Sequence, residues 1–147
     1  YVEFAERLRR FERIVADVAL EIYGRTPTAI HHYGPNRCRR IRKWPHLLSE
    51  HGLGNAIDVG GFAFGPAIDL PDHVPTRLRR RFVVNVSLHW SPRRDIDEIH
   101  SRFLRTLAAR IANTDELFRT FLGPADPRHR GHFHFDMAPT AKVVVFR

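Results

Sequence analysis

The fold of this chain is decided by one apolar, glycine-rich stretch, which reads Glu50-His51-Gly52-Leu53-Gly54-Asn55-Ala56-Ile57-Asp58-Val59-Gly60-Gly61-Phe62-Ala63-Phe64. Residues 56–59 have the composition of a buried strand. The paired glycines that follow predict a bulge or the close approach of another backbone, because glycine leaves room that a side chain would fill. We therefore expect a buried strand to begin at residue 56 and to continue through the glycine pair.

Amphipathic helices are predicted on both sides of this stretch. Residues 2–23 place apolar side chains at three- and four-residue steps, and Gly24 is typical of a helix C-terminus. Residues 95–112 repeat the pattern. Residues 114–121 predict a short third helix capped by Thr114.

Most of the remaining regular secondary structure is predicted to be short strands. A basic loop without periodicity is expected at residues 36–50, and Asp126-Pro127 breaks the chain. The fold class is therefore α+β, a small and mainly antiparallel sheet that carries the site, with two or three helices packed against it. Residues 1–147 predict one domain, since no repeat or low-complexity tract divides them. The strands are expected at residues 28–33, 82–86, 132–137 and 142–146, with a hairpin return at 67–70.

Composition narrows the class of protein. Hydrophobic residues make up 43% of the chain, which predicts a soluble globular domain, and no apolar run is long enough to span a membrane. The net charge of +8 suits a polyanionic partner such as nucleic acid, anionic lipid or an acidic cell-wall polymer. The arginines are scattered and no nucleic-acid motif accompanies them, so specific nucleic-acid binding is not expected. The chain opens on Tyr1, which predicts a trimmed product and leaves a removed leader open.

Cysteine usage restricts any metal chemistry. Cys38 is the only cysteine, so an internal disulfide and a thiolate zinc site are both excluded. Any metal ion must therefore be held by histidine and carboxylate.

Two segments far apart in the chain offer such ligands. His51 and Asp58 are separated by two glycines, which allow a tight turn that brings both side chains to one point. His132 and His134 lie two apart in a strand-like run and so point to the same face, with the intervening phenylalanines in the core. Three protein ligands with one open position are the pattern of a catalytic zinc site. We expect the other histidines considered, His46, His73, His89 and His100, to be surface or core residues without a metal role.

These motifs resemble a group of known zinc peptidases. Ser49-x-His51-x-x-Gly54-x-Ala56-x-Asp58, followed by His132-x-His134, is similar to the paired motif of D-Ala-D-Ala carboxypeptidases, murein endopeptidases and, more distantly, lysostaphin-type peptidases. A closer resemblance, covering about residues 10–139, is to the bacterial extensin-like C-terminal domain family. It is carried by residues 33–40, Ser49-Glu50-His51, residues 55–59, Gly61-Phe62 and residues 122–137.

The resemblance implies a set of roles. It implies zinc ligands at His51, Asp58 and His134, with His132 as the alternative third ligand. His132 would otherwise stabilise the transition state or shuttle a proton. The carboxypeptidases have a glutamate base three residues before this histidine, where the present chain has His129, as the murein endopeptidases do. The base is therefore either His129 or the metal's water working with His132.

Substrate contacts are implied for one arginine and for Ser49. An upstream arginine of the group binds the substrate carboxylate, and Arg39 is the candidate here, with Arg37 and Arg40 as rivals. Ser49 is assigned to the substrate as well. Members of the extensin-like family usually have a second cysteine, which this chain lacks, so Cys38 is expected to be a free thiol. A periplasmic or secreted location is expected, and the single cysteine leaves the cytoplasm open.

Three functions are to be weighed. The first is a zinc metallopeptidase, a monomer that hydrolyses amide bonds of peptidoglycan stem peptides as an endopeptidase or a carboxypeptidase. The second is a cell-wall-binding domain that retains the metal site with little or no turnover, as the missing glutamate allows. The third is a nucleic-acid binder, which has only net charge in its favour.

Overall fold

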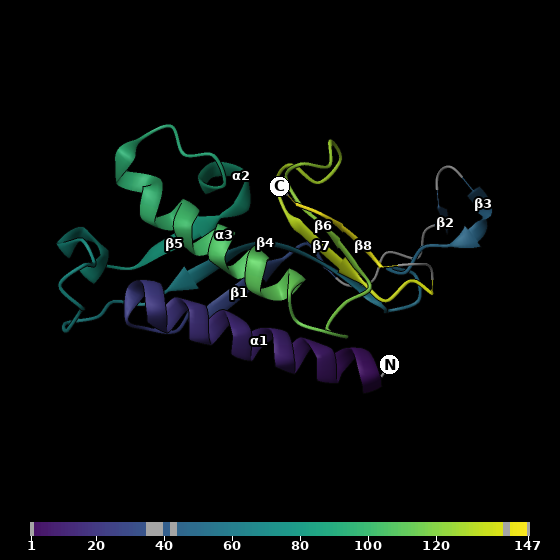
Figure 1. Ribbon diagram of the computed structural model, residues 1–147, viewed down its shortest axis with the longest axis horizontal. Coiled ribbons are helices and arrows are strands. Elements are labelled where there is room, and N and C mark those ends of the chain that lie inside the picture. The colour runs from purple at the N-terminus through teal and green to yellow at the C-terminus, as the bar shows by residue number, and fades with distance from the viewer. Residues whose placement is uncertain (1, 35–39, 42–43, 140–141, 147) are drawn as a thin grey trace.

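The computed structural model describes residues 2–34, 40–41, 44–139 and 142–146. Figure 1 shows the arrangement of its helices and strands. The elements are α1 (Val2–Tyr23), β1 (Ala29–His32), β2 (Arg40–Ile41), β3 (Trp44–Leu48), β4 (Ala56–Phe64), the 3-10 turn η1 (Thr76–Arg79), β5 (Phe82–Asn85), α2 (Val86–His89), the 3-10 turn η2 (Asp95–Asp97), α3 (Glu98–Ala112), β6 (Thr120–Leu122), β7 (Phe133–Asp136) and β8 (Val143–Val145).

In the part of the chain that the structure describes, six strands form one open, mostly antiparallel sheet. Their order is β1-β4-β7-β6-β8, and β5 pairs with β4 outside this path. Strand β4 is the organising strand, since its first half pairs with β7, its second half with β5, and β1 lies along its other edge. Among the strand pairs of the described residues, only β6 and β8 run parallel. The α+β class and the mainly antiparallel sheet predicted from the sequence are confirmed.

The glycine pair of β4 has both of the predicted effects. His31 pairs with Gly61 and His32 with Val59, so Gly60 is the extra residue of a bulge. The bulge shifts the alternation of β4 by one residue, which keeps both Val59 and Phe62 on the buried face. At Gly61 a Cβ atom would lie 2.6 Å from the backbone oxygen of Val84, so the pairing with β5 requires glycine there.

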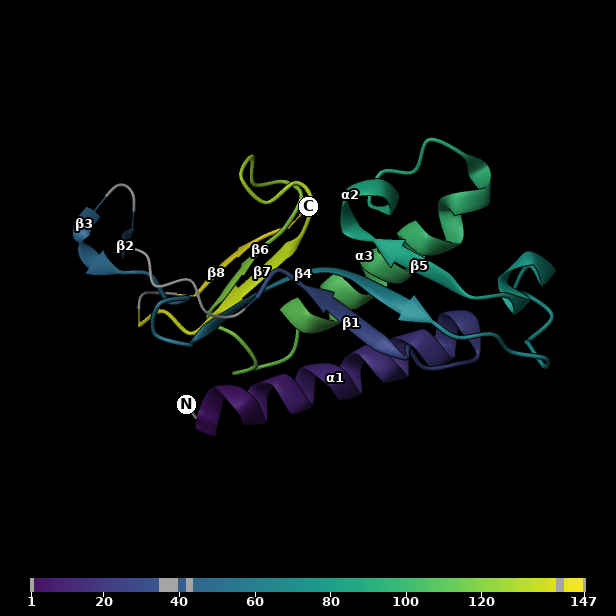
Figure 2. The ribbon, with the colours of Figure 1, turned by 180° about the vertical axis from the view of Figure 1, so that it is seen from behind.

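Helices α1 and α3 cover one face of the sheet, as the two opposite views show (Figures 1 and 2). Phe103 of α3 packs edge-on against Phe62 of β4, and Phe11 of α1 packs against Phe135 of β7. Since Phe135 is fully buried, its neighbour His134 projects from the opposite face. The hydrophobic core thus fixes which face of β7 is left for polar chemistry.

Three local predictions are wrong. Residues 114–121 do not form a helix: Thr114 donates its hydroxyl to the carbonyl of Arg110 at the end of α3, and β6 follows, because Phe121 joins the aromatic core and its strand pairs with β7. Residues 67–70 form no strand, as the Ala67 amide bonds to the Arg79 carbonyl instead. In the described part of 36–50, strands β2 and β3 pair as a hairpin, too short for a periodicity to show.

No helix in the described part of the chain is long and apolar enough to cross a membrane.

Candidate metal centre

Strand pairing brings the two halves of the predicted site together. Asp58 of β4 and His134 of β7 lie directly opposite each other in the antiparallel register, 76 residues apart in the chain. Side chains at such paired positions project from the same face with their Cβ atoms close together. His134 Nδ1 lies 2.8 Å from Asp58 Oδ1. The sheet itself therefore sets the spacing of these two groups.

A tight turn delivers the third group. The amides of Gly52 and Leu53 both donate to the Ser49 carbonyl, and the Asn55 amide donates to that of Glu50. Gly54 closes the turn with a φ of 67°, a conformation that favours glycine. The turn ends one residue before β4, and His51 at its centre is turned back over the first half of that strand.

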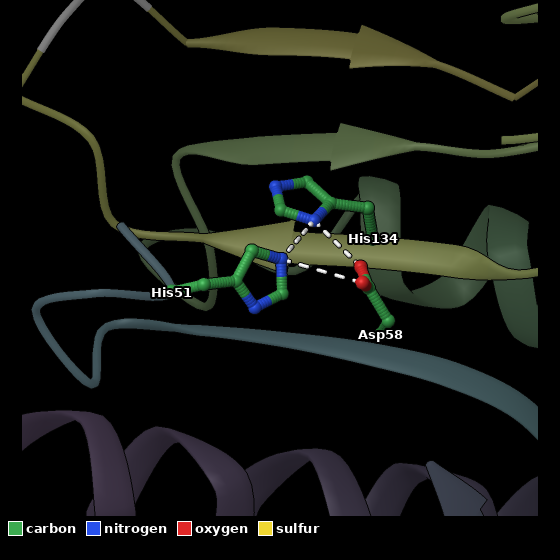
Figure 3. A group of neighbouring side chains, drawn as sticks. All are labelled: His51, Asp58 and His134. Carbon is green, nitrogen blue, oxygen red and sulfur yellow. Dashed lines mark hydrogen bonds and ion pairs between the residues drawn. The ribbon is translucent and has the colours of Figure 1, made fainter. Parts of the chain in front are cut away.

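His51, Asp58 and His134 converge on one point. One ligand atom from each lies within 4.8 Å of the others. His51 Nε2 lies 3.2 Å from His134 Nδ1 and 3.3 Å from Asp58 Oδ2, and Figure 3 shows all three side chains directed inward. Both histidines are buried and the carboxylate is 18% exposed. Two imidazoles and a carboxylate form a donor set that fits a divalent metal ion such as zinc.

A second carboxylate supports His134 from behind. Its Nε2 donates to Asp136 Oδ2 at 2.8 Å, while Asp136 also accepts the Ala138 amide and the Thr120 hydroxyl. Outer carboxylates of this kind orient ligating histidines and leave the other ring nitrogen free for the metal. Sequence reasoning missed Asp136, although its place two residues after His134 on a strand puts it on the same face.

The charges of these groups are strongly coupled. Burial alone would raise the pKa of Asp58, but hydrogen bonds from His134 and His51 hold that pKa far below its usual range. Burial would lower the pKa of His134, yet Asp136 and Asp58 together raise it to about 9. Without a metal ion, His134 is therefore an imidazolium between two carboxylates. A metal ion at Nδ1 would replace one proton and leave the bond to Asp136 intact.

His132 lies beside this centre without joining the three converging groups. Its Nε2 is 3.6 Å from Asp58 Oδ1, and its side chain is 20% exposed. Burial lowers the pKa of His132, so it is neutral near pH 7. Tyr33, whose amide donates to the Asp58 carbonyl, places its ring edge-on against His132 at 5.7 Å. The tyrosine was not singled out from the sequence.

His129, the other predicted catalytic residue, approaches from the loop before β7. Its ring centroid lies 5.0 Å from that of His132 and 5.2 Å from that of His134. His129 Nδ1 lies 2.7 Å from Asp126 Oδ1, an interaction that was not predicted. The structure thus gathers all four predicted histidines of the site on one face of the sheet.

The predicted substrate residues are placed less closely. Arg40 is exposed on β2, in the hairpin that Figures 1 and 2 show apart from β4 and β7. The Ser49 hydroxyl accepts the amide of His51, so within the chain it holds the turn in shape. Arg37, Cys38 and Arg39 lie outside the described residues.

The four histidines set aside by the sequence analysis lie apart from the three converging groups. His46 is exposed. His73 Nε2 bonds to the Ile22 carbonyl, and His89 Nδ1 accepts the Asn85 amide. His100 is buried and its Nδ1 forms a hydrogen bond of 2.8 Å with the Tyr23 hydroxyl.

Comparison with known proteins identifies the family alone. No curated protein and no solved structure matches the chain. A family model described as "Extensin-like protein C-terminus" matches residues 2–91, a segment that ends before β6 and β7. The match includes His51 and Asp58 and excludes His132 and His134. It covers more than half of the sequence, and the chain therefore belongs to this extensin-like C-terminal family.

Proposed function

We propose that the protein is a zinc-dependent hydrolase that cleaves amide bonds in the stem peptides of peptidoglycan. The observation that carries this proposal is the convergence of His51 Nε2, the Asp58 carboxylate and His134 Nδ1 within 4.8 Å, from a turn and two paired strands. Three protein ligands leave one position for water or substrate, as catalytic zinc sites do.

The groups around the ligands supply what amide hydrolysis needs. A zinc ion bound by the three residues would acidify a water molecule and polarise the substrate carbonyl. His132 lies next to Asp58 and can donate a hydrogen bond to the oxygen on which negative charge develops. His129, whose ring lies close to those of both His132 and His134, can exchange a proton with the attacking water and the leaving amine.

The substrate class is supported by resemblance and charge. The two motifs of this chain resemble those of peptidases that act on cell-wall peptides. The net charge of +8 suits an anionic polymer whose peptides carry free carboxylates. We place such an enzyme in the periplasm or outside the cell.

A digest of purified peptidoglycan tests the proposal. The zinc-loaded wild type should release peptide fragments whose masses identify the cleaved bond, whereas His134→Ala should release none. His100→Gln is a matched control, because it removes a buried histidine outside the site. Intact polymer after incubation with zinc-loaded wild type would contradict the hydrolase assignment.

A second candidate is a cell-wall-binding domain that holds the metal ion without efficient turnover. The observation in its favour is His129 at the position where the carboxypeptidases have a glutamate base. Co-sedimentation with peptidoglycan separates the two functions. A binding domain would bring protein down with the polymer and leave the polymer uncut, whether or not His129 is replaced by alanine.

A further inference from the structure

The loop before β7 holds a carboxylate–histidine pair beside the candidate metal centre. Asp126 Oδ1 lies 2.7 Å from His129 Nδ1, and the two side chains are 19% and 16% exposed. The ring of His129 in turn contacts the rings of His132 and His134. Since Nδ1 is occupied by the carboxylate, Nε2 is the ring nitrogen left for other partners.

The loop fixes the carboxylate in place. The same Asp126 Oδ1 accepts the Arg128 amide at 2.9 Å, and the His129 amide donates to the Asp126 carbonyl. The Asp126 amide is itself held by the Gly123 carbonyl, and the next turn begins at His129, whose carbonyl accepts the His132 amide. Asp126 is therefore oriented by backbone bonds on both sides before it meets His129.

The pair matters because the carboxylate restrains the imidazole of His129. An imidazole without a fixed partner could adopt either tautomer and rotate about its side-chain bonds. A carboxylate hydrogen-bonded to one ring nitrogen removes both freedoms, since it keeps the proton on that nitrogen and leaves the other as an acceptor.

We propose that Asp126 is a positioning residue. It accepts a hydrogen bond from the Nδ1–H group of His129 and holds the ring so that Nε2 faces the reaction and serves as the base. This inference rests on the proposed function and deepens it. As the water oxygen bonds to the carbonyl carbon, its proton passes to Nε2 and the carbonyl π pair moves to oxygen. When the C–N bond breaks, that proton passes to the leaving amine, and His129 returns to its neutral form.

Nuclear magnetic resonance of the ring nitrogens tests the orientation without any substrate. Long-range nitrogen–proton spectra of the wild type, metal-free and zinc-loaded, should show that the neutral ring of His129 carries its proton at Nδ1 and not at Nε2. In Asp126→Ala the proton should redistribute toward Nε2. Asp126→Asn should keep the wild-type pattern, because its Oδ1 can still accept from both Arg128 and His129. Asp115→Asn, an exposed aspartate elsewhere, should change nothing.

Steady-state hydrolysis of a peptidoglycan fragment tests the consequence. Asp126→Ala should lower kcat by about ten- to a hundredfold, no more than a positioned general base contributes, with KM and zinc affinity unchanged. Asp126→Asn should recover most of the lost kcat. A fall in zinc affinity or melting temperature that accounts for the lost activity would show a merely structural role and overturn the proposal.

The two experiments distinguish failure of the positioning role from failure of the proposed function. An unchanged His129 tautomer in Asp126→Ala overturns the positioning role, even if the wild type hydrolyses its substrate. A wild type that cuts nothing removes the base role together with the proposed function, and the spectra then still decide whether Asp126 orients His129.

Discussion

Two of the buried histidines in the described part of the chain, His134 and His100, differ in their neighbours. His134 lies between the carboxylates of Asp58 and Asp136, whereas His100 lies between the Tyr23 hydroxyl and the ring of His89. Carboxylates raise the pKa of His134 to about 9 against the effect of burial. At His100 burial dominates and lowers the pKa to about 4. Near pH 7 one imidazole is charged and the other is neutral.

This difference separates a candidate metal site from a core contact. Both histidines are buried and hydrogen-bonded, so burial and hydrogen bonding do not distinguish them. A cation is stabilised only where negative charge converges, and this occurs around His134. His100 instead contacts Phe82 and Tyr23 in the aromatic core. The carboxylates around a histidine are therefore more informative than the histidine.

The largest expected effect is loss of metal binding when the Asp58 carboxylate beside His134 is neutralised. Asp58→Asn keeps the shape of the side chain and removes its charge. We expect zinc affinity to fall by at least about a hundredfold, the upper end of the effect of losing an outer carboxylate. Isothermal titration calorimetry measures it. Tyr23→Phe, which changes the surroundings of His100, should bind zinc like the wild type. Equal losses of zinc affinity in both variants would contradict the distinction between the His134 and His100 sites.

A smaller loss of zinc affinity is expected when the outer carboxylate is neutralised. Asp136→Asn should weaken zinc binding by about ten- to a hundredfold, because His134 loses the partner that orients its ring. The same calorimetric titration applies. If the affinity stayed within the error of the wild-type value, Asp136 would have no part in the centre.

The contact between Tyr23 and His100 should matter for the stability of the fold and not for metal binding. Tyr23→Phe leaves Nδ1 of buried His100 without its hydrogen-bond partner, which should cost about 1–3 kcal/mol of unfolding free energy. Urea unfolding followed by circular dichroism measures this cost. No change in stability would indicate that a water molecule replaces the hydroxyl.

The pH dependence of stability provides the smallest and most selective test. His100 binds its proton at about pH 4 in the folded state and near 6.5 when unfolded. Between these values the unfolded chain binds more protons, so stability is full above pH 6.5 and falls as the pH decreases towards 4. His100 contributes a slope of up to about 1.4 kcal/mol per pH unit. Urea unfolding of His100→Gln should show a shallower slope than wild type in this window, and equal slopes would refute the assignment.

The sequence predicts the local setting of His51, His132 and His134 better than it predicts the residues that surround them. Alternation in residues 132–136 places His132 and His134 on one face, and the glycines that follow His51 indicate a turn. That Asp58 lies opposite His134 depends on the pairing of β4 with β7, which closes over a long stretch of chain and has no local signal. The resemblance to known motifs supplied what local pattern could not.

The partners of the histidines were missed for physical reasons. Asp126 stands before a proline and reads as a chain break, while its contact with His129 depends on the tertiary turn of the loop. Tyr23 reads as one more apolar position of α1, and nothing in its spacing indicates a hydrogen bond to His100, 77 residues away. Similarly, the helix predicted at residues 114–121 gave way to β6, because strand pairing outweighs local propensity.

Anomalous diffraction at the zinc absorption edge tests the central claim most directly. Crystals of the zinc-loaded wild type should show one strong peak about 2.0–2.2 Å from His51 Nε2, an Asp58 oxygen and His134 Nδ1. Crystals of His134→Ala grown under the same conditions should lack it. A wild-type map with no peak between these three side chains, or with its peak at another group of histidines, would contradict the account.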